Sequence, residues 1–392
     1  MAETRRRYLE KAVSADALAS GKMAFISGPR QVGKTTLGRF LLDSEDNEFT
    51  WDDQAFRIRW ARNPVDAVSQ RGPGPVLLDE IHKDRRWKGR IKGLYDRKGE
   101  DIPIVVTGSA RLDYFRRGGD SLTGRYLPYR LHAFSAGERV EPPGPDEILG
   151  RTRPAFPVAD LLSLGGFPEP LLGGSAAKAQ RWSRLRLERL VAEELRDFRS
   201  VRDVEAMRLL SDLLAEGVGS LLSLNSLRED LQVAYATVRD WVAVLQLLYH
   251  SFAIRPYFLK VQRALTASVK LYFYDILQVR SEAARRENLV ALHLLKACHY
   301  WTDLAMGEFD LRYLRTRDGK EVDFVVVRDR KPWMLVECKS GETAPVATLV
   351  QLGRQLGTAR NLQVVFRRGH DRVFSESGVR VLDADRFLAG LV

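Results

Sequence analysis

The first part of the chain alternates short apolar runs with stretches of helical periodicity. Apolar runs of strand length occur at residues 23–26, 49–53, 76–80 and 102–109, and apolar positions recur at helical spacing over residues 37–42. Continuous apolar runs of this length are typical of strands buried on both faces of a sheet. The alternation of strand and helix predicts an α/β domain with a parallel sheet.

A different pattern follows in the middle of the chain. Helical patterns occur at residues 204–216, 224–231 and 236–248, and two apolar runs follow at 252–257 and 269–274. Three helices followed by a two-stranded ribbon predict a winged helix-turn-helix.

The last part of the chain mixes one long helical pattern with strands. The helical pattern begins at Arg285 and runs through His299, and strand-like runs follow at residues 309–315, 321–327 and 333–339. These runs predict a second α/β region, in which the strands at 321–327 and 333–339 form a hairpin.

Composition marks the limits between these regions. A Pro- and Gly-rich segment at residues 141–157 indicates a domain boundary, and a basic helical region at 177–200 reads as a lid or linker helix. We therefore predict a first α/β domain, a linker with a helical lid, a winged-helix domain and a C-terminal α/β domain, at residues 1–140, 141–203, 204–275 and 276–392.

The most informative motif follows the first apolar run. Residues 27–36 contain the pattern G-x-x-x-x-G-K-[ST] between a strand and a helix, the context in which this pattern forms a phosphate loop. The glycines let the backbone wrap the phosphates, Lys34 reaches the β- and γ-phosphates, and Thr35 binds Mg²⁺. We expect ATP and Mg²⁺ as cofactors, and nucleotide contacts from Gly28, Pro29, Arg30, Gln31, Val32, Gly33, Lys34, Thr35 and Thr36.

The runs at 76–80 and 102–109 end in polar residues that suit nucleotide hydrolysis. We assign Asp79 to hold Mg²⁺ through water and Glu80 to polarise the attacking water. A hydroxyl at the end of the next strand, Ser109 or Thr107, would orient that water or sense the γ-phosphate; an ordinary turn residue is the alternative.

Arginines farther along suit the stabilisation of a transferring phosphate. Arg125 is the first candidate to reach a neighbouring subunit's γ-phosphate, and Arg111 is the second. An arginine that only pairs with a surface carboxylate is an equal alternative.

The charge favours a polyanionic partner. The formal net charge is +11 at pH 7, which favours nucleic acid, although it also fits a merely basic protein. In the winged helix-turn-helix, the third helix would present Tyr235, Thr237 and Arg239 to a DNA groove. The ribbon region would offer phosphates the basic side chains of Lys260, Arg263 and Lys270. The same fold also serves as a protein-docking unit, so that alternative stays open.

A second set of candidate residues lies in the C-terminal hairpin. Asp323 begins one strand, while Glu337 and Lys339 project from one face of the next, and Glu287 lies in the preceding helix. Carboxylates that hold Mg²⁺ and a lysine that steadies the nucleophilic water suit a metal-dependent phosphodiesterase. An ordinary hairpin with a cross-strand ion pair is the alternative.

Some classes are disfavoured. The chain has 2 cysteines, which is too few for a disulfide framework or a structural zinc site, and we expect reduced thiols in the cytoplasm. No apolar signal core follows the first residues, and no apolar stretch is long enough to span a membrane.

Taken together, these motifs resemble a large bacterial and archaeal family of AAA+ ATPases that carry a C-terminal domain of unknown function numbered 4143. The resemblance implies an AAA+ domain, a winged helix, a C-terminal domain similar to restriction-endonuclease-like folds, and a homo-oligomer, by analogy a hexameric ring. His82 stands where the family usually has Gln, and Cys338 where it usually has Val. The matching stretches are residues 28–35, 76–81, 107–109, 122–125, 165–169, 287–290, 321–324 and 337–339.

These features favour an Mg-dependent ATP hydrolase that acts on DNA. The alternatives are an ATP-regulated nuclease that uses Asp323, Glu337 and Lys339, and a nucleotide-switched scaffold whose nuclease-like domain is inert.

Overall fold

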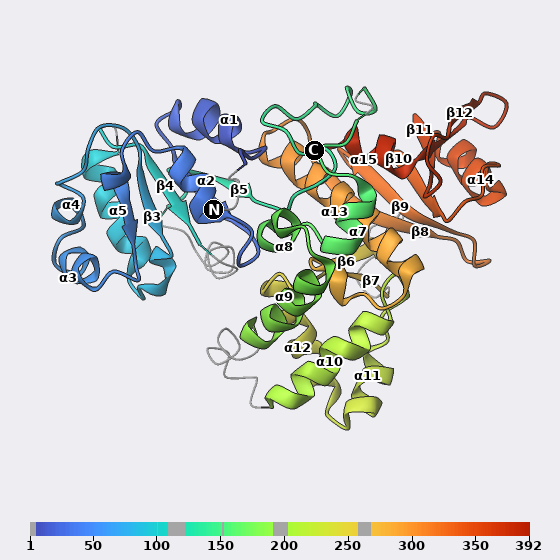
Figure 1. The fold of residues 1–392 in the computed structure, drawn as a ribbon, viewed down its shortest axis with the longest axis horizontal. Helices are drawn as coiled ribbons and strands as arrows, with labels where there is room; N and C mark the ends of the chain where they lie inside the picture. Colours follow the sequence, from blue (N-terminus) through green and yellow to red (C-terminus); the bar gives the residue numbers. More distant parts are fainter. Residues whose placement is uncertain (1–4, 100, 109–121, 151–152, 191–202, 258–267) are drawn as a thin grey trace. The chain divides into compact units, whose positions relative to one another are not determined.

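The computed structural model describes the chain except residues 1–4, 100, 109–121, 151–152, 191–202 and 258–267 (Figure 1). The chain forms two compact units. Unit 1 holds the chain up to Ala133 together with Arg139–Glu141, and unit 2 holds Phe134–Glu138 and Pro142–Val392.

Unit 1 is built on a five-stranded sheet in the order β2-β3-β4-β1-β5, and all of its pairings are parallel. Its strands are β1 (Met23–Ser27), β2 (Glu48–Thr50), β3 (Val76–Asp79), β4 (Ile104–Thr107) and β5 (Tyr126–Arg130). Its helices are α1 (Glu10–Val13), η1 (Ser14–Leu18), α2 (Lys34–Phe40), η2 (Glu45–Asn47), α3 (Gln54–Arg62), α4 (Pro64–Ala67), η3 (Ile81–Lys83) and α5 (Trp87–Lys98). The predicted α/β domain with a parallel sheet is confirmed.

The strand pattern explains the layering of unit 1. Every residue of β1, β3 and β4 is buried, as expected of parallel strands that are covered on both faces. Helix α2 packs closely on the sheet at Gly38, where a Cβ would lie 2.7 Å from the Leu77 side chain. Strand β5 contains Pro128, which cannot donate a ladder hydrogen bond, and this strand lies at the edge of the sheet.

Unit 2 contains the helices predicted in the middle of the chain. The patterns at 204–216, 224–231 and 236–248 correspond to α10 (Val204–Glu216), α11 (Leu224–Leu231) and α12 (Tyr235–Leu247). The remaining helices are α7 (Val158–Leu164), α8 (Pro168–Gly173), α9 (Ala176–Arg189), η7 (Ile276–Gln278), α13 (Glu282–Asp303), α14 (Ala347–Leu356) and α15 (Ala384–Ala389).

An eight-stranded sheet forms the other layer of unit 2, in the order β12-β13-β11-β10-β9-β8-β6-β7. Its strands are β6 (Ser251–Pro256), β7 (Lys270–Phe273), β8 (Phe309–Arg315), β9 (Glu321–Arg328), β10 (Lys331–Lys339), β11 (Arg360–Val365), β12 (Asp371–Phe374) and β13 (Val379–Asp383). The ribbon β6–β7 is antiparallel, and β6 also pairs in parallel with β8. The ribbon therefore continues the sheet that carries the C-terminal hairpin.

None of the helices in the described part of the chain combines the length and apolar character that a membrane span requires.

Candidate functional site

The phosphate loop connects β1 to α2 in a tightly constrained backbone. Gln31 and Gly33 have φ angles of 63° and 97°, in the left-handed region. Gly28 has a φ of 154°, and a Cβ there would lie 2.2 Å from the carbonyl oxygen of Leu131, so only glycine fits. The buried Lys34 ammonium donates to the carbonyl oxygens of Gly28 (3.1 Å) and Pro29 (2.8 Å). Carbonyl oxygens of the phosphate loop itself therefore hold the Lys34 ammonium in this structure.

The end of β3 brings a carboxylate to this loop. The Thr35 hydroxyl donates to both Asp79 carboxylate oxygens, at 3.2 and 3.1 Å, and the Thr107 hydroxyl donates to Asp79 Oδ1. Burial raises the pKa of Asp79, the hydrogen bond from Thr107 opposes that rise, and the charge of Glu80 adds to it. The structure thus joins the two residues that the sequence assigns to Mg²⁺, together with Thr107, one of the two hydroxyls proposed as sensors. Ser109 lies outside the described residues.

Glu80 has a backbone that costs free energy. Its φ is 55°, in the left-handed region that disfavours residues with a Cβ, and its N–H donates to the carbonyl of Thr107 at 3.0 Å. Its carboxylate lies 3.6 Å from His82 Nε2 and 3.8 Å from Lys83 Nζ. Strained residues of this kind concentrate at functional sites, and His82 and Lys83 were missed as neighbours because only the fold of η3 turns them toward Glu80.

Arg125 lies at the opposite end of the strands from the phosphate loop. It precedes Tyr126, which pairs with Met23, the first residue of β1, whereas the loop follows the last. Five residues of strand span about 16 Å, so Arg125 does not reach the phosphate loop of its own subunit. Its guanidinium pairs with Asp96 (Nε–Oδ1 2.6 Å), which raises the pKa of Arg125 and lowers the pKa of Asp96. Arg111 lies outside the described residues.

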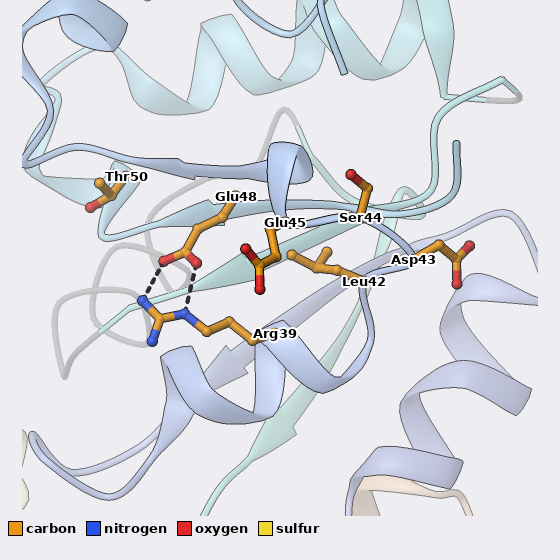
Figure 2. A pocket seen from close by; sticks show the side chains of 7 residues that line it. All are labelled: Arg39, Leu42, Asp43, Ser44, Glu45, Glu48 and Thr50. Atoms are coloured by element: carbon orange, nitrogen blue, oxygen red, sulfur yellow. Dashed lines mark hydrogen bonds and ion pairs between the residues drawn. The ribbon is translucent and has the colours of Figure 1, made fainter. Parts of the chain in front are cut away.

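A hollow of about 660 Å³ in unit 1 is lined by residues of α2, of the segment that follows α2, and of β2 (Figure 2). Arg39 forms a two-pronged ion pair with Glu48 there, at 2.7 and 2.8 Å. Asp43 and Glu45 add further acidic side chains, so the wall repels a triphosphate. Its lining residues are Arg39, Leu42, Asp43, Ser44, Glu45, Glu48 and Thr50, and none belongs to the predicted nucleotide contacts.

The predicted DNA-contacting residues fall into three groups. On α12, Tyr235 and Arg239 are exposed and Thr237 is half-buried, and Arg239 pairs with Asp240 at 2.9 Å. Lys260 and Arg263 lie outside the described residues. Lys270 corrects the sequence prediction, because its side chain is buried and cannot be presented to a phosphate backbone.

The residues predicted for a phosphodiesterase site gather around β9 and β10. Asp323 Oδ2 accepts a hydrogen bond from the N–H of Cys338 at 2.8 Å. Glu337 Oε2 accepts from the N–H of Asp323 at 3.3 Å, and Glu337 Oε1 lies 2.6 Å from Lys339 Nζ. Asp323, Glu337 and Lys339 are therefore brought together, as the sequence predicts.

Helix α13 adds Glu287 to this group. The side chain of Asn288 bonds both backbone groups of Phe273, at 2.7 and 2.8 Å, and so fixes α13 beside β7. Glu287 then accepts a hydrogen bond from the Tyr272 hydroxyl at 2.7 Å. Lys270 Nζ lies 3.9 Å from Glu287 and also pairs with Glu321.

We call Lys270, Tyr272, Glu287, Glu321, Asp323, Glu337 and Lys339 the acidic cluster. Lys270, Tyr272 and Glu321 were missed as its members. Residues 270 and 272 are two apart and therefore lie on the same face of a strand, which the sequence alone indicates. The sequence does not indicate the pairing of β6 with β8, which brings the ribbon to the hairpin.

Burial dominates the charge states of the cluster. Burial and the charge of Asp323 raise the pKa of both Glu287 and Glu337 to about 7, while Lys270 and Lys339, respectively, oppose the rise. Burial also raises the pKa of Asp323 and, with Glu287, that of the Tyr272 hydroxyl. Neighbouring carboxylates thus retain protons near neutral pH unless a cation joins them.

Comparison with known proteins follows the same division. Residues 20–140 match an AAA domain (AAA_14), and residues 284–387 match a domain of unknown function, DUF4143. The chain therefore carries matches to an AAA domain and to a DUF4143 domain, in the order that the sequence resemblance implies. Residues 157–276 match a further domain of unknown function, DUF8612, which spans the three helices and the ribbon of unit 2. The family resemblance found in the sequence is confirmed.

The curated proteins and solved structures that this chain resembles are distant in sequence. The uncharacterized proteins Rv2008c of Mycobacterium tuberculosis and Mb2031c of Mycobacterium bovis are each 24% identical over 388 residues, covering 95% of this chain and 82% of each relative. Among solved structures, the Aeropyrum pernix Orc1 protein in complex with DNA is 15% identical, with a TM-score of 0.34, over 74% of this chain and 94% of that chain. The Thermotoga maritima RuvB Holliday junction branch migration motor is 15% identical, with a TM-score of 0.29, over 62% and 88%. Scores this low transfer no property of either protein to this chain.

Proposed function

We propose that the protein is an Mg-dependent ATP hydrolase that acts on DNA. One observation carries the hydrolase: the hydroxyl of Thr35, in the phosphate loop, lies 3.1 Å from the Asp79 carboxylate at the end of β3. In nucleotide hydrolases of this class, a loop hydroxyl and a strand carboxylate hold the metal that bridges the phosphates.

The residues present fit Mg²⁺. Thr35 and Asp79 offer hard oxygen donors, which Mg²⁺ prefers, and such sites complete the coordination with water and phosphate oxygens. When bound, the metal would neutralise charge on the phosphates. Lys34 would leave the carbonyls of Gly28 and Pro29 for phosphate, and Glu80 would orient the attacking water.

Replacement of Glu80 by Gln tests this assignment. We expect Glu80→Gln to abolish ATP turnover while ATP binding persists, because the amide keeps the shape but cannot act as a base. Lys34→Ala is the companion variant, which should lose binding as well. Unchanged turnover in Glu80→Gln would refute the site assignment.

DNA as the target rests on charge and on α12. The net charge of +11 favours a polyanion, and Tyr235 and Arg239 are exposed on the third helix. If phosphate contacts dominate, DNA affinity falls steeply with salt. A flat salt response in a titration with duplex, single-stranded and branched DNA would favour a scaffold that docks a protein.

A second function, ATP-regulated DNA cleavage, is favoured by the acidic cluster. Asp323, Glu337 and Lys339 converge on one end of the hairpin, as metal-dependent cleavage would need. In the described part of the chain, however, no group of three or more His, Cys, Asp and Glu side chains is arranged to hold a metal ion. Asp323→Ala should abolish any Mg²⁺-dependent cleavage, and persistent cleavage would exclude this cluster.

One assay separates these functions. ATP turnover and DNA integrity are followed together, with and without each form of DNA. Stimulated turnover without cleavage supports a DNA-directed ATPase, cleavage supports the nuclease, and neither supports a nucleotide-switched scaffold.

Oligomerisation is part of the proposal. Because Arg125 lies at the end of the strands opposite the phosphate loop, it would complete an active site only in a neighbouring subunit, as in a ring. Arg125→Ala should then lower turnover without weakening ATP binding. Mixing this variant with Glu80→Gln protein should restore part of the activity, because some mixed interfaces carry both native residues.

A further inference from the structure

A buried arginine near the N-terminus contacts the phosphate loop. Arg7 is 2% exposed, and its guanidinium donates from Nη1 to the carbonyl of Val32 at 2.9 Å and from Nη2 to the carbonyl of His132 at 2.5 Å. Burying a guanidinium is costly unless hydrogen bonds replace water, so this placement constrains both carbonyls. Val32 belongs to the phosphate loop, and His132 follows β5.

The contact with Val32 fixes one peptide plane of the loop. The C=O of Val32 and the N–H of Gly33 belong to one trans peptide, and in such a peptide the two groups point in opposite directions. When Arg7 holds the carbonyl of Val32, the N–H of Gly33 is therefore turned away from Arg7. Backbone N–H groups of this loop are the donors that cradle phosphates.

The neighbouring tyrosine completes the connection to the segment after β5. The Tyr8 hydroxyl donates to the carbonyl of Arg130 at 2.6 Å and accepts from the N–H of His132 at 3.0 Å. The same segment packs against the loop at Gly28 and bonds Ser27 through the N–H of Leu131 (2.8 Å). Arg7 and Tyr8 thus join the phosphate loop to residues 130–132.

We propose that Arg7 is a positioning residue of the nucleotide site, which orients the Val32–Gly33 peptide for phosphate and couples it through His132 to the segment that leaves unit 1. The proposal rests on the proposed ATP binding by the phosphate loop. It adds an N-terminal residue that the motif does not contain, and a route by which nucleotide occupancy alters residues 130–132.

The segment that follows residue 133 is held within unit 2 by contacts of its own. Its Ala136 N–H donates to His293 at 2.9 Å, and its Glu138 carboxylate lies 2.5 Å from the buried Lys296 ammonium. Only the step from Ala133 to Phe134 separates the two anchored stretches along the chain.

The test compares Arg7→Met and Arg7→Lys with the wild type, in the full chain carrying Glu80→Gln so that ATP is not consumed. ATP affinity is measured by calorimetry, and amide hydrogen exchange is measured in peptides covering residues 28–34 and 127–133. We expect Arg7→Met to weaken ATP binding about tenfold and to raise exchange in both peptides. In the wild type, ATP should lower exchange at 127–133, and this response should be lost in Arg7→Met.

Arg7→Lys separates position from charge. A lysine keeps the charge but not the planar fork that bridges two carbonyls, so affinity should stay low. Full recovery with lysine would overturn the proposal, because attraction to the triphosphate would then explain the effect. Arg6→Met is the matched control, since Arg6 is 68% exposed and pairs with Glu10, and it should behave as wild type.

The outcomes distinguish this proposal from the proposed function. If the Glu80→Gln protein with native Arg7 binds no ATP, the proposed function and the positioning role both fail. If it binds ATP and Arg7→Met binds equally well with the same exchange response, only the role of Arg7 is overturned. Should Arg7→Met not fold, as judged by circular dichroism, Arg7→Lys alone decides.

Discussion

Glu337 makes a measurable link between pH and the stability of unit 2. Glu337 is 5% exposed. Burial, and after it the charge of Asp323, raises the pKa of Glu337 from 4.5 to about 7, and the hydrogen bond from Lys339 opposes this rise. A displacement of this size corresponds to about 3 kcal/mol of differential stability as an upper bound. The carboxyl must ionise in a site that disfavours its charge.

The sign follows from proton binding. Between pH 4.5 and about 7 the unfolded chain releases the Glu337 proton while the native chain retains it, so native stability falls as pH rises through this window. Glu337→Gln removes the titrating group and should reduce that fall in stability by about 1–3 kcal/mol. The fall should not vanish, because Glu287 and Asp323 still titrate beside Lys270 and Lys339.

The assay is urea unfolding at a series of pH values from 4 to 8, with metal chelated. Unfolding is monitored by pulsed hydrogen exchange in peptides from β9 and β10. These peptides report the unfolding of unit 2 itself, which matters in a chain of two units. Glu342→Gln is the control, because Glu342 is exposed. Parallel pH profiles for the wild type and Glu337→Gln would refute the reasoning. Recovery of wild-type stability at pH 8 on adding Mg²⁺, absent in the variant, would identify the cluster as a metal site.

Two further predictions concern the segment 134–138 of unit 2. Lys296→Met should destabilise unit 2 by about 3–5 kcal/mol, because it removes the cation that lies 2.5 Å from the buried Glu138 carboxylate, and adding Glu138→Gln should recover part of the loss in the same urea assay. His293 accepts a hydrogen bond from Ala136 only when neutral, and burial lowers its pKa to about 4, so stability should be lost as pH falls from 6.5 toward 4. His293→Gln should show a flatter profile in that range, and an unchanged profile would exclude His293 as the cause.

In unit 1, the sequence predicted most of what matters because its signals are local. Within a motif of ten residues, Gly28 leaves room for the carbonyl of Leu131 and Gly33 adopts a φ of 97°. Apolar strands buried on both faces are visible as continuous runs. Strand β5 escaped prediction because Pro128 and its mostly half-buried positions give this edge strand no such continuous apolar run. Arg7 escaped for another reason: its partners, Val32 and His132, lie 25 and 125 residues away.

In unit 2, the helices and strands were predicted better than their assembly. The three helices α10–α12 and the ribbon formed where the patterns indicated, and the pairing Asp323–Glu337–Lys339 followed from the hairpin alone. Lys270 was misassigned because a basic residue on a ribbon is usually solvated, and only the pairing of β6 with β8 carries it to Glu287 and Glu321. Long-range strand order is the information that a single sequence does not hold.

That strand order changes how the parts of unit 2 should be understood. If β6 and β7 formed a free wing, a ligand on α12 would leave the hairpin unaffected. Instead α12 packs on β6, β6 pairs with β7, and β7 supplies Lys270 and Tyr272 to the acidic cluster. A displacement of α12 that is passed on to β7 would therefore move the Lys270 ammonium and the Tyr272 hydroxyl, which oppose the rise in the pKa of Glu287 that burial and Asp323 cause. Helix α12 and the acidic cluster contact the same sheet, so DNA binding and the chemistry of the cluster should be tested in the intact unit.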